Sequence, residues 1–331
     1  MIVVWRVVNS CNLSCAFCAY DKRLEFPRSQ TNPAEIARFA NILAAYQSMT
    51  GDRILLSWLG GEPLLWAPLE PLTLAARALG LEVSATTNGT TLGSPRLRRH
   101  LCESYKELTI SVDGFPEIHD RMRGWRGGFD KLRVWVPELA GEIRALGSPL
   151  KLRANVVLMR QNVQDFPALC LELANWGISE ITFNQLGGRD RPEFYPDHRL
   201  RTGDVDALAA QLPSIRRRLL DFGASLIGGE NYLKRIYASA RDERNPVDDC
   251  GPGENFLFVD EQGRISPCSF TSQDYGIDVR SVKTATDLAL LSGRFRAMQQ
   301  SQGSAQCLDC LSTQVCDKFK KSYLPALENV S

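Results

Sequence analysis

The chain has 331 residues, 39 basic and 38 acidic side chains, and a formal net charge of +1. This length supports a full catalytic domain with a smaller second domain, and the balanced charge gives no sign of a nucleic-acid partner. The ten cysteines are clustered as metal ligands are, which argues against a secreted disulfide scaffold. No apolar run has the length of a membrane span and no signal peptide is recognisable, so we expect a protein of the reducing cytoplasm without a membrane partner.

The β-branched run over residues 2–8 predicts a buried first strand. Directly after it come Cys11, Cys15 and Cys18, at Cys-x3-Cys-x2-Cys spacing. A loop this tight brings three thiolates to one centre. Four thiolates would saturate a cubane of four irons and four sulfides, so three leave one iron without a protein ligand. Since catalytic metal sites keep an open position, the loop predicts a catalytic iron–sulfur site; the alternative is cysteines placed by chance or for packing.

Strands and helices then alternate along the chain. We expect five further strands, over residues 53–59, 81–86, 107–112, 150–158 and 179–184. A helix begins at Pro33 after an Asn32 cap, and others are expected over about 69–79, 94–105, 128–146 and 163–176. Pro137 should kink or split the fourth of these helices. The alternation predicts an α/β fold, either a parallel βα barrel or an open sheet.

Polar or glycine-rich segments follow most of these strands. They are Gly60-Gly61-Glu62-Pro63, Asn88, Asp113 and Gln185. In βα barrels the carboxyl ends of the strands hold the active site, so these segments and the cysteine loop should converge on one mouth. Each alone is also compatible with an ordinary loop, since Gly and Asn are common there; the convergence of five loops indicates a site.

The character of the chain changes after residue 188. Loops are followed by a helix over 202–222, which Pro213 should interrupt, and by another over 232–240. A strand at 256–259, a turn at 260–263 and a strand at 265–268 come next. A second cysteine set occupies this region: Cys250, Cys268, Cys307, Cys310 and Cys316. Taken alone, it is also compatible with a zinc ribbon. Cys102 and Cys170 lie in predicted helices, where we expect them to pack as small hydrophobes.

The first cysteine loop, with Phe17 just before its third cysteine, resembles the radical S-adenosylmethionine (SAM) superfamily. The resemblance implies a partial (β/α)6 TIM-like barrel over 1–188, a helical linker over 189–245 and an auxiliary-cluster domain over 246–331. In that family a [4Fe–4S] cluster chelates SAM at its open iron. One electron, from an external donor such as flavodoxin or ferredoxin, then cleaves SAM to a 5′-deoxyadenosyl radical.

The same resemblance implies the contacts of SAM. Gly60-Gly61-Glu62-Pro63 matches the motif that pairs with the methionine amino group, to which Glu62 offers an anion. Arg123, with Arg121, is either a carboxylate clamp or part of a solvated basic loop, and Tyr20 either marks the adenine contact or packs. The residues implied to contact SAM and its cluster are Phe17, Tyr20, Gly60, Gly61, Glu62, Pro63, Asn88, Ser111, Asp113, Arg123 and Asn155.

The second cysteine set resembles the SPASM/twitch domain that carries auxiliary clusters in radical SAM enzymes. The complete SPASM pattern has seven cysteines, of which this chain keeps five, with Lys320 at one of the missing places. Two complete four-cysteine clusters are therefore not possible. The resemblance implies one auxiliary iron–sulfur cluster, held by Cys250, Cys268, Cys307 and Cys310. Cys316 is then a fifth ligand, a hydrogen-atom donor or a bystander.

The implied reaction is hydrogen abstraction from a substrate C–H bond, followed by oxidation, epimerisation or crosslinking. Two substrate classes compete: ribosomally made peptides, and small polar molecules such as aminocyclitols. The chain starts at the first barrel strand, without the leader-binding domain of many peptide maturases, and its cysteine count is reduced; both features favour the small molecule slightly. The many peptide-modifying members of the wider family keep the two classes nearly even. The hypothesis from another class is a non-catalytic iron–sulfur or zinc protein, against which the intact Gly60–Pro63 motif argues.

Overall fold

The computed structural model describes residues 1–247 and 249–311. Its centre is a ten-stranded sheet in the order β10-β9-β8-β1-β2-β3-β4-β5-β6-β7. Strands β1 to β7 are parallel neighbours in chain order, β8 adds in parallel to β1, and β9 and β10 are antiparallel. The strands are β1 Ile2–Val8, β2 Leu55–Gly60, β3 Glu82–Thr87, β4 Glu107–Ser111, β5 Lys151–Leu158, β6 Glu180–Gln185, β7 Ser225–Ile227, β8 Phe256–Val259, β9 Arg264–Ser266 and β10 Ile277–Asp278. The predicted partial barrel with a small C-terminal extension is confirmed.

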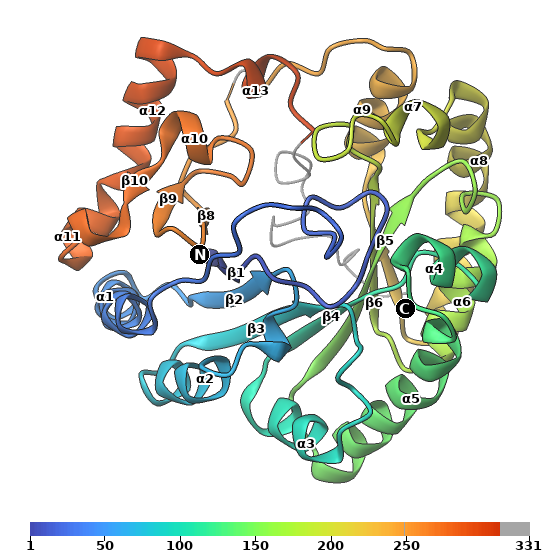
Figure 1. The fold of residues 1–331 in the computed structure, drawn as a ribbon, viewed down its shortest axis with the longest axis horizontal. Coiled ribbons are helices and arrows are strands. Elements are labelled where there is room, and N and C mark those ends of the chain that lie inside the picture. Colours follow the sequence, from blue (N-terminus) through green and yellow to red (C-terminus); the bar gives the residue numbers. More distant parts are fainter. Residues whose placement is uncertain (248, 312–331) are drawn as a thin grey trace, which may run out of the picture.

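Helices surround the outer face of the curved barrel sheet, and others lie beside its C-terminal extension (Figure 1). They are α1 Pro33–Thr50, α2 Leu69–Ala78, α3 Pro95–Ser104, α4 Pro116–Arg123, α5 Gly128–Leu146, α6 Phe166–Asn175, α7 Tyr195–His198, α8 Thr202–Leu220, α9 Glu230–Ala240, α10 Ser272–Tyr275, α11 Ala285–Ala289, α12 Leu291–Gln302 and α13 Ala305–Leu308. Two 3-10 turns, η1 Pro63–Leu65 and η2 Val279–Ser281, complete the elements. The predicted start of α1 is confirmed, because the Asn32 side chain accepts a hydrogen bond from the Ala34 N–H at 3.0 Å.

The predicted interruption at Pro213 is wrong, and of the kink or split predicted at Pro137 the split does not occur. Pro137 lies inside α5 and Pro213 inside α8, and each helix continues past its proline. A proline removes the hydrogen bond to the carbonyl four residues earlier. For Pro137 that carbonyl belongs to the exposed Arg133, and Pro213 is itself exposed, so water can replace the lost bond.

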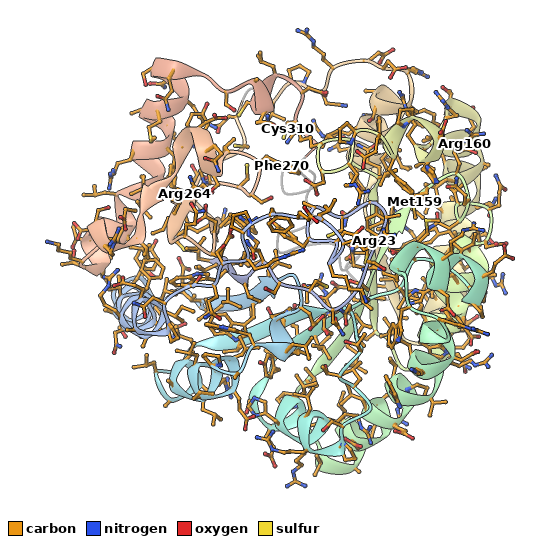
Figure 2. The ribbon with its side chains drawn as sticks, viewed as in Figure 1. Arg23, Met159, Arg160, Arg264, Phe270 and Cys310 are labelled. Carbon is orange, nitrogen blue, oxygen red and sulfur yellow. The ribbon has the colours of Figure 1, made fainter. Side chains whose placement is uncertain are left out.

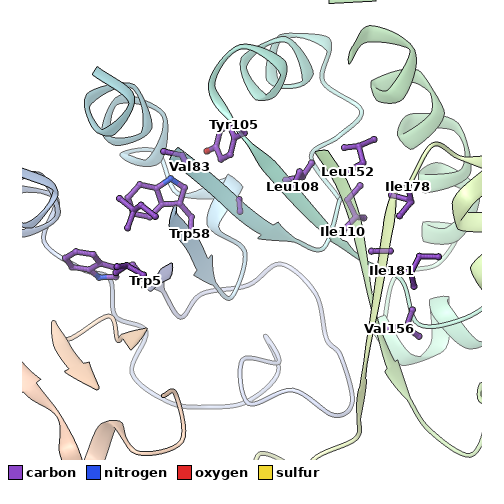
Figure 3. Close-up of a cluster of buried hydrophobic side chains, with 14 of the residues drawn as sticks. Trp5, Trp58, Val83, Tyr105, Leu108, Ile110, Leu152, Val156, Ile178 and Ile181 are labelled. Carbon is purple, nitrogen blue, oxygen red and sulfur yellow. The ribbon is translucent and has the colours of Figure 1, made fainter. Parts of the chain in front are cut away.

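The core lies between the sheet and its helices. Alternate strand residues point outward into it, among them Trp5 and Trp58, both fully buried (Figure 3). Burial of such a side chain stabilises the fold by roughly 1.5–3 kcal/mol. The other face of each strand points into the barrel and is only partly buried, as at Arg6, Asn155 and Asn184. The alternation thus leaves a polar, solvent-accessible inner face.

The sheet extends beyond the six predicted strands at both edges. The segment predicted as a helical linker contains β7, which pairs with β6, while α8 packs on α6. At the other edge β8 joins β1, so the C-terminal cysteine-rich segment continues the barrel sheet. The strands predicted over 256–259 and 265–268 are present as β8 and β9, whereas β7 and β10, with three and two residues, carry too little periodicity to be recognised in a sequence. None of the helices described is long and apolar enough to span a membrane.

Candidate active site

The first cysteine loop is held tightly between β2 and α4. A Cβ on Gly61 would lie 2.1 Å from the Ser10 carbonyl oxygen, and one on Gly124, which ends α4, would lie 2.0 Å from Ser14 Oγ. The Ala16 N–H also donates to the Met122 carbonyl at 3.1 Å. Glycine is needed at Gly61 because the two backbones approach so closely, and at Gly124 because its φ of +61° is left-handed and the Ser14 side chain lies against it. Helix α4 was not predicted from the sequence.

The three thiols of this loop are electrostatic neighbours: Cys11 raises the pKa of Cys15, and Cys15 raises that of Cys18. Burial is the largest cause of the raised pKa of each thiol and brings that of Cys18 to about 12. Hydrogen-bond donors face the sulfurs: the Leu13 N–H lies 3.5 Å from Cys11 Sγ and the Tyr20 N–H lies 3.3 Å from Cys18 Sγ. Iron supplies the positive charge that deprotonates such thiols, so the set fits a cluster.

Glu62 is 1% exposed, and its carboxylate accepts three hydrogen bonds. The donors are the Leu64 N–H at 3.1 Å, the Thr87 hydroxyl at 2.8 Å and the Asn88 N–H at 2.7 Å. A carboxylate has about four acceptor positions, so one remains for an ammonium group. Burial raises the pKa of Glu62 to about 7. The neighbouring glycines let the chain approach itself, because a Cβ on Gly60 would lie 2.6 Å from the Val8 carbonyl oxygen and one on Gly61 2.1 Å from that of Ser10.

Asn88 links the end of β3 to the cysteine loop. Its Nδ2 donates to Asn12 Oδ1 at 2.9 Å and lies 3.7 Å from Cys11 Sγ. Its Oδ1 accepts from the Thr90 N–H and hydroxyl. The predicted convergence of this residue with Cys11 and Glu62 is thus present in the structure.

Asp113 and Arg123 form a buried ion pair, with 2.6 Å between Asp113 Oδ2 and Arg123 Nε. Asp113 Oδ1 also accepts from the Val157 N–H at 2.8 Å. The Arg123 guanidinium lies 5.4 Å from the centre of the Phe17 ring and its NH1 lies 4.0 Å from Cys15 Sγ. The alternative of a solvated basic loop is therefore wrong for Arg123, which is 8% exposed at the end of α4, whereas Arg121 is exposed and pairs with Glu117.

Asn155 and Ser111 are register partners on β5 and β4. Asn155 Oδ1 accepts from the Thr182 hydroxyl at 3.0 Å and from Asn184 Nδ2 at 2.7 Å. These neutral groups line the inner face of the barrel below the cysteine loop. Nearer the loop, burial raises the pKa of Tyr20 to about 12, and its ring packs near Phe26 and under the Arg6 guanidinium.

Four thiols of the second set come together from three separate segments. Cys250 precedes β8, Cys268 follows β9, and Cys307 and Cys310 lie in and after α13. Burial is the largest cause of the raised pKa of Cys250, and the charges of Cys268, Cys307 and Cys310 raise it further. Cys316 lies outside the described residues. Within 1–247 and 249–311, no three Cys, His, Asp or Glu side chains are drawn together tightly enough to hold a single metal ion.

The loop after β6 connects the two cysteine sets. The sequence predicted Gln185, the last residue of β6, at the mouth of the barrel but did not single out Arg189 or Asp190. Arg189 donates to the Asp309 carbonyl at 2.8 Å, and its guanidinium lies 4.4 Å from the ring of Phe270. Asp190, the next residue, raises the pKa of both Cys18 and Tyr20. Phe270 and Cys310 are labelled in Figure 2. No motif marks this loop; its position after the sixth strand was the one available signal.

The model of the radical SAM superfamily matches residues 5–170, half of the chain. This chain belongs to the radical SAM superfamily. It is therefore a radical SAM enzyme, which uses a [4Fe–4S] cluster and SAM. The matched segment begins in β1 and ends in α6, and so includes the cysteine loop, Glu62 and the Asp113–Arg123 pair.

Curated relatives of this radical SAM enzyme fall into several activities. Fe-coproporphyrin III synthase of Methanosarcina barkeri is 30% identical over 56% of this chain and 44% of its own length, so the chain spans less than half of that relative. AdoMet-dependent heme synthase of Nitratidesulfovibrio vulgaris is 23% identical, covering 95% of this chain and 86% of that protein. Mycofactocin maturase MftC of Mycolicibacterium smegmatis is 24% identical, with 95% and 76% covered.

Solved structures share the whole fold of this radical SAM enzyme. SuiB of Streptococcus suis, bound to SAM, has a TM-score of 0.66 at 17% identity, covering 95% of this chain and 71% of SuiB. anSMEcpe with bound AdoMet has a TM-score of 0.65 at 15% identity, covering 95% of this chain and 88% of that one. Both matches extend through the C-terminal region, in keeping with a SPASM/twitch-type extension of the barrel.

Proposed function

We propose that this enzyme abstracts a hydrogen atom from a C–H bond of a peptide or small polar substrate, leading to oxidation, epimerisation or crosslinking. The observation that carries the proposal is the open three-cysteine site beside a buried carboxylate with one free acceptor position. Cluster and SAM together supply the 5′-deoxyadenosyl radical. Cys11, Cys15 and Cys18 would hold the cluster, which draws its electron from an external donor such as flavodoxin or ferredoxin in a reducing cytoplasm.

The surrounding residues hold this site in shape. Glu62 directs its remaining acceptor position to the SAM ammonium. Asn88 fixes Cys11, and Arg123, held by Asp113, fixes Cys15 and Phe17. Such preorganisation lowers the activation barrier of the reaction, because the reacting groups are already oriented when the substrate binds. Gly60, Gly61 and Pro63 support Glu62, while Tyr20, Ser111 and Asn155 complete the polar surface that faces SAM.

Cys250, Cys268, Cys307 and Cys310 are proposed to hold one auxiliary iron–sulfur cluster. Their mutual electrostatic contacts support this, and the loop that carries Cys307 and Cys310 is tied to the barrel. Arg235 donates to the Asn245 and Cys310 carbonyls, and Arg189 donates to that of Asp309. Four protein ligands close a cluster, so its part would be to accept an electron from the substrate radical. Cys316 stays a candidate fifth ligand, hydrogen donor or bystander.

A peptide is the leading substrate class. MftC is a maturase, and SuiB has been solved with its precursor peptide SuiA. The inner face of the barrel supports the choice, because its neutral amides and hydroxyls, such as those of Asn155, Asn184 and Thr109, can bond peptide groups. A small polar molecule is the second candidate, favoured by the same polar face and by synthases among the relatives.

Anaerobic reconstitution tests the proposal. About eight irons per chain are expected if both sets hold four-iron clusters, and dithionite with SAM should yield 5′-deoxyadenosine. Cys15→Ala should abolish that product, whereas Cys307→Ala should spare it and impair substrate turnover. Cys170→Ala is the matched control, because Cys170 is buried in α6 away from both sets and should retain iron and product. Intact SAM after reduction of the fully loaded wild type would refute the proposed function.

A further inference from the structure

We infer that Thr271, Tyr275 and Gln299 form a shell of hydrogen-bond donors to the second cysteine set and raise the reduction potential of the cluster it carries. The inference rests on the proposed auxiliary cluster. Each donor meets a different sulfur: Thr271 meets Cys268, Tyr275 meets Cys307 and Gln299 meets Cys250. None of the three belongs to a motif recognised in the sequence.

Tyr275 is the most constrained of the three donors. It is fully buried, and its hydroxyl neighbours the Cys307 thiol, which after burial raises the pKa of Tyr275. A buried phenol requires a hydrogen-bond partner, and the fold brings it to a sulfur. Helix α10 is held there by the Ser272 hydroxyl, which donates to the fully buried Asp260 carboxylate at 2.7 Å.

Thr271 and Gln299 approach from either side of the set. Thr271 Oγ1 lies 3.3 Å from Cys268 Sγ and 3.5 Å from the Cys268 carbonyl oxygen. Of the hydroxyl and the sulfur, only the hydroxyl can donate once the sulfur is a thiolate. Gln299 Nε2, on α12, lies 3.8 Å from Cys250 Sγ. The donors therefore come from two helices and the turn between β9 and α10, so the local fold places one at each of three ligands.

Donors at cluster sulfurs favour the reduced state. In the one-electron couple the oxidised cluster gains one electron, no bond is made or broken, and the added negative charge spreads onto the sulfurs. Hydrogen bonds to sulfur then strengthen, and the potential rises. At a net value of about 1 kcal/mol for one hydrogen bond, loss of one donor should lower the ratio of reduced to oxidised cluster about fivefold at a fixed potential.

The test is a potentiometric titration followed by electron paramagnetic resonance (EPR). It uses the full chain carrying Cys11→Ala, Cys15→Ala and Cys18→Ala, so that only the second cluster gives a signal. Gln299→Leu and Tyr275→Phe are introduced separately, and both should shift the midpoint to a more negative potential. Gln300→Leu is the matched control, since Gln300 is the next residue of α12 and is exposed; its midpoint should stay that of the parent.

The outcomes separate a failure of the donor inference from a failure of the auxiliary cluster itself. A negative shift in Gln299→Leu with none in Gln300→Leu supports the inference, even if Tyr275→Phe fails to retain iron. An unchanged midpoint in Gln299→Leu overturns it, as does an equal shift in the control. A parent chain without a second iron–sulfur signal would refute the auxiliary cluster and this inference together, while leaving SAM cleavage by wild type as an independent measure of the proposed function.

Discussion

The two cysteine sets of this enzyme are built on opposite plans. The first lies in one short loop, and its sulfurs meet backbone N–H groups, the Asn88 side-chain amide and one guanidinium. The second is assembled from three separate segments, and its sulfurs meet side-chain donors. A loop with three ligands leaves an iron open to SAM, whereas four ligands from distant segments would close a cluster. On the proposed function, one fold would thus provide an open site for chemistry and a closed one for electron transfer.

The two cysteine sets are also held in place by different kinds of contact. The first loop depends on close packing at two glycines, against the Ser10 backbone at Gly61 and the Ser14 side chain at Gly124. The second depends on hydrogen bonds between segments that are far apart in the sequence, such as those that Arg189 and Arg235 donate to the carbonyls of Asp309 and Cys310. Close packing should therefore be the vulnerable feature of the first set.

Among substitutions that distinguish the two cysteine sets, Gly61→Ala is expected to have the largest effect. The added Cβ would lie 2.1 Å from the Ser10 oxygen, so the first loop must shift. Iron should fall by about four per chain, and 5′-deoxyadenosine formation should be lost. Gly141→Ala, in α5, meets no atom within 4 Å and should keep all the iron. Iron analysis of both variants tests this. Full iron loading with normal SAM cleavage in Gly61→Ala would contradict the claim that close packing at Gly61 holds the first cysteine loop.

Arg123→Gln should have the next largest effect. It leaves the Asp113 carboxylate buried without its cation, which costs about 3–5 kcal/mol of unfolding free energy. Arg121→Gln on the same helix removes an exposed pair, 3.4 Å from Glu117, and should cost less than about 1 kcal/mol. Anaerobic urea unfolding measures both variants. Equal losses in the two would show that the buried pair does not anchor α4 against the cysteine loop.

Glu62→Gln should change the pH dependence of stability by a smaller amount. The pKa of Glu62 in the fold, about 7, exceeds its ordinary value of 4.5 because of burial. Its contribution is therefore complete below about pH 4.5 and is lost as the pH rises through 7. Without SAM, wild type should lose about 1–3 kcal/mol from this group between pH 5.5 and 8, a loss absent from Glu62→Gln. Urea unfolding at both pH values checks this, and parallel pH profiles would count against the buried carboxylate as the cause.

Much of the barrel could be predicted from the sequence because its signals are local. Cys11, Cys15 and Cys18 are close in the chain, and strands such as β5 are long enough to show their periodicity. Helix α4 was missed: its eight residues are strongly polar, yet Arg123 is buried through a partner ten residues away. The donors at the second set were missed for a related reason. Thr271 and Tyr275 come close to Cys268 and Cys307 only in the folded chain, so no sequence pattern marks them.

The most direct test of the open and closed sites is EPR of each reduced cluster, with and without SAM. One chain carries Cys307→Ala and Cys310→Ala, so that only the first cluster remains; the other carries alanine at Cys11, Cys15 and Cys18. SAM should change the spectrum of the first chain and leave that of the second unchanged. A SAM-dependent change in the second chain, or none in the first, would contradict the assignment of the open iron to the N-terminal loop.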